Sequence, residues 1–217
     1  MATFGKTNFY IDGFNLYYGC LRGNKNCRWL NIRALCQSLY PNNEINRIRY
    51  FTAGVKPTDT DPKKPLRQEV YLRALKTIDC LDVHMGTFMS HKVRMPLATK
   101  PAHGGRTVEV IKTEEKGSDV NLATYLLLDG FKGDYDVAIV VSNDSDLVEP
   151  IKVVKQELHL PIGVVNPYLD MKMMSRDLRN VATFYKRVRV GLLESCQFPE
   201  TMSDEAGMIT RPKKWVF

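Results

Sequence analysis

The 217 residues, 44% of them hydrophobic and 25% charged, suffice for one globular α/β domain with small additions. No apolar run is long enough to span a bilayer, and residues 1–8 lack the apolar core of a secretory signal, so we expect a cytoplasmic protein without a membrane partner. The net charge of +7 suits a polyanionic partner, and the five scattered cysteines argue against a zinc site or a disulfide framework.

In the first half of the chain, apolar runs typical of strands alternate with helical spacing. We predict strands over residues 9–11 and 45–52, with a short helix over residues 30–39 between them. Apolar residues four apart then predict a helix over residues 66–78, and a strand over residues 81–88 follows it. This order of elements is typical of a parallel sheet with helices on its faces.

Residues 92–95 and 106–112 are two further strand-like segments, and the loop 96–105 between them is rich in Pro, Ala, Gly and Lys. The pair forms either a β-hairpin that projects near the functional site or a disordered loop. The strand-like flanks favour a hairpin with a mobile tip.

The second half of the chain continues the alternation of helix and strand. In chain order we predict a helix over residues 119–129, a strand over 137–142, a helix that ends at 158, a strand over 162–165 and a last helix over 171–184. Ser118 is a suitable N-cap for the first of these helices, and Gly130 is a suitable stop. The pattern predicts a three-layer α/β/α sandwich with a central, mostly parallel sheet over residues 1–190. A C-terminal extension over residues 191–217 then packs on this domain or trails it.

Acidic residues follow two of the predicted strands at the point where each strand ends. Asp12 comes directly after the first strand, and Asp144 and Asp146 come just after the strand richest in β-branched residues. Asp119 lies at the start of the helix that leads to the second of these strands. Because the carboxyl ends of parallel strands meet at one edge of an open sheet, we expect the four side chains to lie close together.

Four carboxylates at one edge of a sheet repel one another strongly. At an effective dielectric constant of about 20, one pair about 4 Å apart costs about 4 kcal/mol, so protonation or a divalent cation has to offset the repulsion. An oxygen-only set of ligands suits Mg²⁺ or Mn²⁺. Such an ion orients a phosphodiester, neutralises developing charge and acidifies a bound water, so no nucleophilic side chain is required.

Polar and basic residues near these acids are candidates for supporting roles. Asn15 lies three residues after Asp12 and can orient a phosphate oxygen or the loop, and Ser142 can hydrogen-bond a phosphate or a carboxylate. Lys116 precedes a glycine and a helix N-terminus, which is a favourable place for an anion. Further candidate phosphate contacts are Lys63, Lys64 and Arg67.

Each acid also has a purely structural interpretation. Asp144 or Asp146 can cap a helix. Asp119 can face a helix dipole, and Asp12 with Gly13 can form a turn. Four such coincidences at one rim are less expected than one shared site, so we retain the hypothesis of a metal site.

Three sequence blocks together resemble the NYN domain, a family of PIN-like metal-dependent nucleases found widely in bacteria. The blocks are Ile-Asp-Gly-Phe-Asn at 11–15, Glu-Lys-Gly-Ser-Asp-Val at 115–120 and Val-Val-Ser-Asn-Asp-Ser-Asp-Leu at 140–147, and the similarity covers residues 8–165. The resemblance implies a PIN-like fold and Mg²⁺- or Mn²⁺-dependent cleavage of RNA. The residues that it implies for the metal are Asp12, Asp119, Asp144 and Asp146, with Asn15 and Ser142 close by. Asn143 stands where the family more often has Gly, a difference that need not disturb the ligands.

These residues lead to the prediction of a metal-dependent ribonuclease, an endonuclease, that hydrolyses RNA phosphodiester bonds at a carboxylate-bound Mg²⁺ or Mn²⁺ ion. Two alternatives stay open. One is a catalytically weak RNA-binding regulatory module with the same fold, and the other is a small-molecule phosphohydrolase that uses the same acids. The methionines of the segment 171–174 also allow a homodimer.

Overall fold

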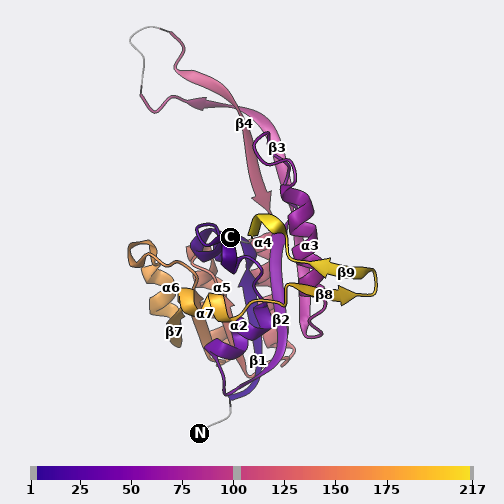
Figure 1. Ribbon diagram of the computed structural model, residues 1–217. Helices are drawn as coiled ribbons and strands as arrows, with labels where there is room; N and C mark the ends of the chain where they lie inside the picture. The colour runs from indigo at the N-terminus through magenta and orange to yellow at the C-terminus, as the bar shows by residue number, and fades with distance from the viewer. Residues whose placement is uncertain (1–3, 100–103, 216–217) are drawn as a thin grey trace.

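The computed structural model describes residues 4–99 and 104–215, which are built around a seven-stranded sheet in the order β4-β3-β2-β1-β5-β6-β7 (Figure 1). The edge strand β4 pairs antiparallel with β3, and every other pair of neighbours in this order is parallel. The strands are β1 (Phe4–Asp12), β2 (Asn43–Ala53), β3 (Leu81–Pro96), β4 (Thr107–Lys116), β5 (Val137–Val141), β6 (Ile162–Asn166) and β7 (Phe184–Arg187).

Helices cover both faces of this sheet, which gives the three-layer α/β/α sandwich that the sequence predicts. Helices α2 (Ile32–Leu39) and α3 (Lys64–Lys76) pack on one face. Helices α4 (Ser118–Phe131) and α5 (Val148–Glu157) pack on the other. The predicted fold class is therefore confirmed.

Alternation along the central strand β1 explains why there are two cores. Phe9 and Ile11 belong to the core under α2 and α3, whereas Tyr10 belongs to the core under α4 and α5, and all three are fully buried. Strand β5 is buried throughout, as its β-branched residues predict for a strand covered on both faces. Asp144 and Asp146 therefore lie in a turn that follows a rigid, fully buried strand.

None of the described helices combines the length and the apolar character required to cross a bilayer. Short elements complete the fold. The short elements are α1 (Gly13–Leu16), a π-helical turn (Tyr17–Leu21), α6 (Arg176–Val181), α7 (Val190–Ser195), the hairpin strands β8 (Thr201–Asp204) and β9 (Gly207–Thr210), and the 3₁₀ turns Lys25–Cys27, Ser145–Leu147, Met171–Met173 and Lys213–Trp215.

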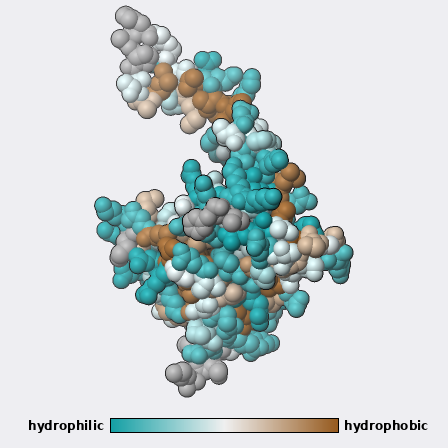
Figure 2. All heavy atoms as spheres, viewed as in Figure 1, coloured by the Kyte–Doolittle hydropathy of each residue, from teal (hydrophilic) through white to brown (hydrophobic). Residues whose placement is uncertain are grey.

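Strand β3 continues beyond the sheet and forms a projecting arm with β4. Gly86 is its last residue in register with β2, and from Thr87 to Pro96 it pairs with β4. The arm rises from the edge of the sheet at which β2 ends (Figure 1), so the predicted hairpin is confirmed, although it begins at residue 87 and not 92. Apolar side chains gather along the arm (Figure 2) because a two-stranded ribbon has no second layer to bury them. The predicted mobile tip includes residues 100–103, which lie outside the described residues.

The predicted last helix over residues 171–184 is wrong. The segment forms a 3₁₀ turn, then α6, then strand β7. Ser175 starts a new helix by accepting a hydrogen bond from the backbone N–H of Leu178 at 3.3 Å. Phe184 packs on the bare backbone of Gly163, where a Cβ atom would lie 2.1 Å from its ring. Packing against β6 therefore decides the conformation of a segment whose apolar spacing suggested a helix.

Both predicted ends of α4 also need correction. Gly117, and not Ser118, is the N-cap, and its φ of 100° lies in the left-handed region that favours glycine. Gly130 does not stop the helix, which continues to Phe131. A Cβ atom at Gly130 would lie 2.7 Å from the hydroxyl oxygen of Tyr135, so this glycine serves close packing.

The residues that follow strand β7 pack on the face that α2 and α3 cover. The backbone N–H of Phe198 donates to the carbonyl of Trp29 at 2.9 Å, and the Trp29 indole donates to the carbonyl of Pro199 at 2.7 Å. The ring of Trp215 lies 6.3 Å from that of Trp29. A boundary between a domain and an extension at residue 190 stays a prediction.

Candidate active site

Asp12 ends β1 and caps α1, and three hydrogen bonds hold its carboxylate. Its Oδ1 accepts from the backbone N–H of Asn15 at 2.9 Å. Its Oδ2 accepts from the side-chain amide of Asn15 at 2.6 Å and from the hydroxyl of Ser142 at 2.9 Å. Among the described contacts, Oδ2 thus has a donor for each of its two lone pairs, whereas Oδ1 keeps one acceptor position. Asp12 is therefore a buried, fixed carboxylate with one oxygen available to a ligand.

The same polar groups join Asp12 to the loop after β5. The Ser142 hydroxyl that donates to Asp12 accepts from the backbone N–H of Asp144 at 3.1 Å. The Asn15 Oδ1 accepts from the backbone N–H of Asn143 at 3.2 Å. The structure therefore brings Asn15, Ser142 and Asp144 together around Asp12, with Asn15 and Ser142 as the residues that position the acid.

Asp119 and Asp146 complete the group of four acids. Asp119 is half-buried in the first turn of α4. Asp146 is exposed in the 3₁₀ turn after β5, and its backbone N–H donates to Asp144 Oδ1 at 3.0 Å. Burial, followed by the charges of Asp12, Asp144, Glu115 and Asp146, raises the pKa of Asp119 to about 6. Burial also raises the pKa of Asp12, and the charge of Asp144 adds to that rise. The four carboxylates therefore share one electrostatic environment.

The four carboxylates are suitable ligands for a hard divalent cation, but their side chains do not converge on one point in this structure. Among residues 4–99 and 104–215, no three acidic, histidine or cysteine side chains converge closely enough to hold a metal ion. The donors are nevertheless carboxylate oxygens, and burial followed by neighbouring negative charges raises the pKa of Asp12 and Asp119, which is the environment that a bound cation relieves. Asp12 is fixed, so ligation would require the more exposed Asp119, Asp144 and Asp146 side chains to turn toward it.

Two residues near the acids are not among the predicted site residues, although the sequence allowed Glu115 as a further member of the acid group. Glu115 supports the start of α4, because its Oε1 accepts from the N–H of Ser118 at 3.1 Å and from its hydroxyl at 2.8 Å. Tyr168 lies close to the group, since burial and then the charges of Asp12 and Asp144 raise its pKa. Tyr168 follows β6 by two residues, so the rule of strand ends would have found it. The place of Glu115 depends on the register of the arm, which the sequence does not give.

Lys116 lies at the base of the arm, opposite Thr87 of β3. Its side chain is 58% exposed, and its Nζ lies 3.7 Å from the carboxylate of Glu114. An exposed ammonium two residues before the α4 helix is accessible to a phosphate, although the Glu114 carboxylate offsets part of its charge.

The other three predicted phosphate contacts lie at the start of α3. Lys63 is the exposed N-cap residue of this helix. Lys64 and Arg67 line a cavity whose wall includes Gly13, the residue after Asp12. Arg67 forms an ion pair with Asp61, so its charge is partly offset. The structure thus places Lys64 and Arg67 near the Asp12 loop.

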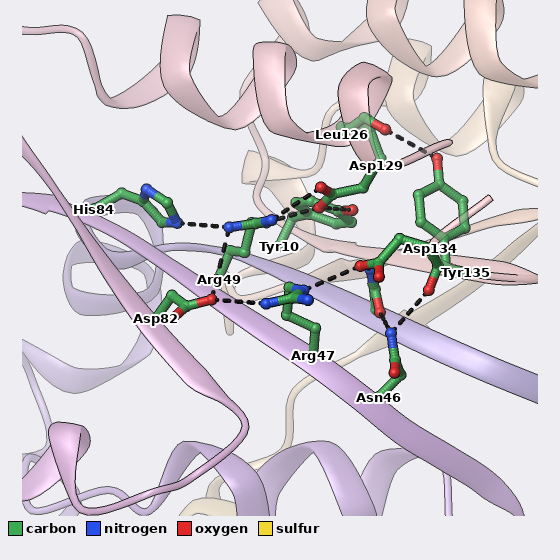
Figure 3. Close-up of polar contacts among 11 residues, drawn as sticks. Tyr10, Asn46, Arg47, Arg49, Asp82, His84, Leu126, Asp129, Asp134 and Tyr135 are labelled. Carbon is green, nitrogen blue, oxygen red and sulfur yellow. Dashed lines mark hydrogen bonds and ion pairs between the residues drawn. The ribbon is translucent and has the colours of Figure 1, made fainter. Parts of the chain in front are cut away.

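A second polar network, not predicted from the sequence, lies under the far end of α4 (Figure 3). Arg49 binds Asp129 through two hydrogen bonds, Nε to Oδ2 at 2.7 Å and Nη2 to Oδ1 at 2.9 Å, and the Tyr10 hydroxyl donates to the same Oδ2 at 2.8 Å. The Arg49 guanidinium also lies 4.4 Å from the ring centroid of Tyr125 and 3.1 Å from His84 Nε2. Burial, and then the charge of Arg49, lowers the pKa of His84. Charges of opposite sign are matched here, which is typical of a structural network.

The three-layer fold and the acids where its parallel strands end together define a PIN-like domain. The family model of the NYN domain matches residues 6–189, so the chain belongs to the NYN domain family. Membership of this family indicates a nuclease-like function related to RNA.

Two individual proteins are similar over most of the chain. The first is 6-hydroxy-3-succinoylpyridine 3-monooxygenase HspA of Pseudomonas putida, which is 28% identical over 237 residues that cover 97% of this chain and 75% of the relative. The second is a solved structure, a protein of unknown function from Vibrio parahaemolyticus. It has a TM-score of 0.53 and 15% identity, and the match covers 88% of this chain and 96% of that chain. At this identity the second likeness shows the fold alone.

Proposed function

We propose that this protein is a Mg²⁺- or Mn²⁺-dependent ribonuclease that hydrolyses RNA phosphodiester bonds as an endonuclease. The observation that carries the proposal is the group of acids at the sheet edge, where burial and then the charges of its acidic neighbours raise the pKa of Asp119 to about 6, in a chain of the NYN domain family. Carboxylates that repel one another in this way are typical of a site prepared for a cation. The metal would be held by Asp12, Asp119, Asp144 and Asp146.

The residues of the chain have separable roles in this reaction. A bound Mg²⁺ or Mn²⁺ ion would orient the scissile phosphate, neutralise developing charge and lower the pKa of a coordinated water. Asn15 and Ser142 hold the Asp12 carboxylate in one orientation, so that no energy is spent on ordering it during the reaction. Lys116, Lys63, Lys64 and Arg67 would contact phosphates on either side of the cleaved bond.

RNA is the proposed partner because of the family and the charge. A net charge of +7 attracts a polyanion, and each phosphate contact makes the affinity more sensitive to salt. A cytoplasmic location and a homodimer stay proposals of the same kind, and sedimentation of the purified protein would test the second.

The test is an incubation of the purified protein with a labelled single-stranded RNA in Mn²⁺, in Mg²⁺ and in EDTA. Internal fragments that need the metal and vanish in Asp144→Asn support the proposal. Glu149→Gln is the matched control, because Glu149 is a nearby acid whose side chain is 75% exposed and lies outside the group of four. Cleavage that Asp144→Asn leaves unchanged would overturn the proposed roles.

Two other functions give different results in this test. A regulatory module that binds RNA without cleaving it would retard the labelled RNA in a salt-sensitive manner and release no fragments. The name of the Pseudomonas putida relative motivates the other candidate, oxidation of a hydroxylated pyridine. Oxygen consumption with such a pyridine and a reductant, and no cleavage of RNA, would favour it.

A further inference from the structure

A cavity of about 130 Å³ lies next to the acids, between α1, the end of β2 and α3. Aromatic rings form much of its lining: Phe14, Tyr17, Tyr18, Tyr50, Tyr71 and Trp215. A cavity of about 150 Å³ with apolar walls accepts a benzene ring, so this volume suits one planar ring system.

Three cations share the lining with these rings, namely Arg28, Lys64 and Arg67. Arg28 is held in place, since its Nε donates to the carbonyl of Leu21 at 3.1 Å and its guanidinium lies 5.5 Å from the ring centroid of Tyr17. Arg67 pairs with Asp61. Within the described part of the chain, the ammonium group of Lys64 has no hydrogen bond or ion pair. The cavity therefore offers stacking surfaces together with an unpaired positive charge.

The backbone that forms one wall has an unusual conformation. Residues Tyr17–Leu21 form a π-helical turn, closed by a hydrogen bond from the N–H of Arg22 to the carbonyl of Tyr17 at 2.7 Å. Such turns are rare and occur often at functional sites. The turn presents Tyr17 and Tyr18 side by side, with ring centroids 5.3 Å apart, and the Tyr18 side chain is exposed. The Tyr17 ring is partly buried against the core, whereas the Tyr18 ring lies outside it.

The position of the cavity ties it to the acids. Gly13 belongs to its wall and follows Asp12 directly, so their Cα atoms are about 3.8 Å apart. A Cβ atom at Gly13 would lie 2.8 Å from the Tyr50 hydroxyl and 2.7 Å from the carbonyl oxygen of Phe51, so a glycine is needed where the Asp12 loop crosses the cavity wall. The cavity wall therefore adjoins the residue that carries the Asp12 carboxylate.

We propose that this cavity binds a planar heteroaromatic ring that carries an anionic group, and that the ring is a nucleobase of the RNA strand next to the cleaved phosphate. The proposal rests on the proposed ribonuclease function for its source of the ring. Stacking on tyrosine holds any base, so the cavity fixes the strand on the sheet edge without strong sequence preference. Lys64 neutralises the phosphate attached to the bound nucleotide.

Binding to the Asp144→Asn protein tests the cavity independently of cleavage. The probes are uridine 5′-monophosphate and adenosine 5′-monophosphate, with ribose 5-phosphate as the matched anion that lacks a ring, each titrated by calorimetry. We expect the nucleotides to bind about tenfold or more tightly than ribose 5-phosphate, which is the size of effect that one stacked base gives. Equal binding of all three would overturn the proposal.

Variants of two lining residues locate the binding. Val55 is half-buried in the lining, so Val55→Trp fills the cavity, and Tyr17→Ala removes a half-buried wall ring. Both should abolish the advantage of the nucleotide, whereas Tyr17→Phe should keep it. A nucleotide advantage that survives in Val55→Trp places the binding elsewhere and overturns the proposal. Circular dichroism of each variant shows that the fold is intact.

Two further measurements separate the sources of the ring. In the cleavage assay, an RNA with one abasic position beside the cleaved bond should raise KM for the intact protein about tenfold, and leave KM unchanged for Val55→Trp. Absence of cleavage, with nucleotide binding that Val55→Trp removes, would defeat the ribonuclease function and keep the nucleotide site. Pyridine-3-carboxylate has the same ring-and-anion chemistry, and tighter binding of this compound than of the nucleotides would overturn RNA as the source.

Discussion

Helix α4 carries an acid at each end, and the two acids have opposite surroundings. Asp129, near the end, accepts hydrogen bonds from Arg49 and Tyr10 and is 3% exposed. Asp119 lies in the first turn, where burial and then the charges of acids such as Asp12 raise its pKa to about 6. Ten residues of helix separate the two acids by about 15 Å, so one rigid element holds a matched charge and a mismatched one.

This difference distinguishes charges that stabilise the fold from charges that prepare a site. In the network of Figure 3, partial burial would raise the pKa of Asp134, but hydrogen bonds from Arg47 and Asn8 lower it. At the other end of α4, burial and then the charges of neighbouring acids raise the pKa of Asp119, and its charged form costs stability. A chain retains such a cost where the group is used, so the mismatch supports the proposal that this end of α4 belongs to the active site.

Replacement of Arg49 by Gln is the largest perturbation that this comparison predicts. The Asp129 carboxylate would stay buried without its cation, and breaking a buried pair costs about 3–5 kcal/mol of unfolding free energy. Urea denaturation followed by circular dichroism measures the loss. A loss below about 1 kcal/mol would remove the contrast between the two ends of α4.

Addition of Mn²⁺ or Mg²⁺ is expected to stabilise the protein by the next largest amount. A ligand that binds the folded state at a hundred times its Kd adds about 2.7 kcal/mol, which raises Tm by about 5–10 °C for a chain of this size. The acids supply the ligands, so Asp144→Asn should lose most of the shift in a thermal-melt titration. An equal shift in the variant would place the metal elsewhere.

Asp119→Asn is expected to stabilise the metal-free protein at pH 8 by about 1 kcal/mol. This is less than the full pKa shift would give, because the side chain is only half-buried and water screens its charge. The pKa of Asp119 is about 6 in the folded state, whereas its ordinary value, which applies to the unfolded chain, is 3.8. The folded state therefore binds this proton more tightly than the unfolded state does. Stability due to this group therefore falls as pH rises from about 4 to about 6 and stays low above.

Thermal melts in EDTA at several pH values measure this effect. The advantage of Asp119→Asn over the unaltered protein should be largest at pH 8 and vanish near pH 4. An advantage that is independent of pH would mean that the substitution acts through packing or helix propensity and not through charge.

Arg47→Gln is expected to have the smallest effect. Its side chain is 37% exposed and pairs with Asp82, which is 50% exposed, and with Asp134, which is 30% exposed. Water screens both pairs, so the loss should be at most about 1 kcal/mol. The same denaturation experiment compares it with Arg49→Gln. A loss as large as that of Arg49→Gln would show that burial does not decide the strength of the network.

The sequence predicted the layers of the fold and the place of the acids because both depend on local patterns. The apolar run of β5 and the acids after it are contiguous, and parallel strands bring such ends to one edge. Arg49, Asp129 and Tyr10 lie far apart in sequence and meet through strand register and helix packing, which no local pattern encodes.

The failures have the same cause. Residues 171–184 have helical spacing, but the exposed edge of β6 and the bare Gly163 select a strand for Phe184. Ser118 is a good cap in isolation, but Glu115 occupies its N–H and hydroxyl once the arm is formed. The aromatic cavity was missed because its walls come from four separate segments of the chain.

The most direct test of the central claim is the rate of RNA cleavage under single-turnover conditions in Mn²⁺. The Asp144→Asn rate should fall about 100-fold or more, the scale expected when a metal ligand is lost, while Glu149→Gln stays within about twofold. Equal rates for Asp144→Asn and the unaltered protein would contradict the assignment of the acid group as the active site.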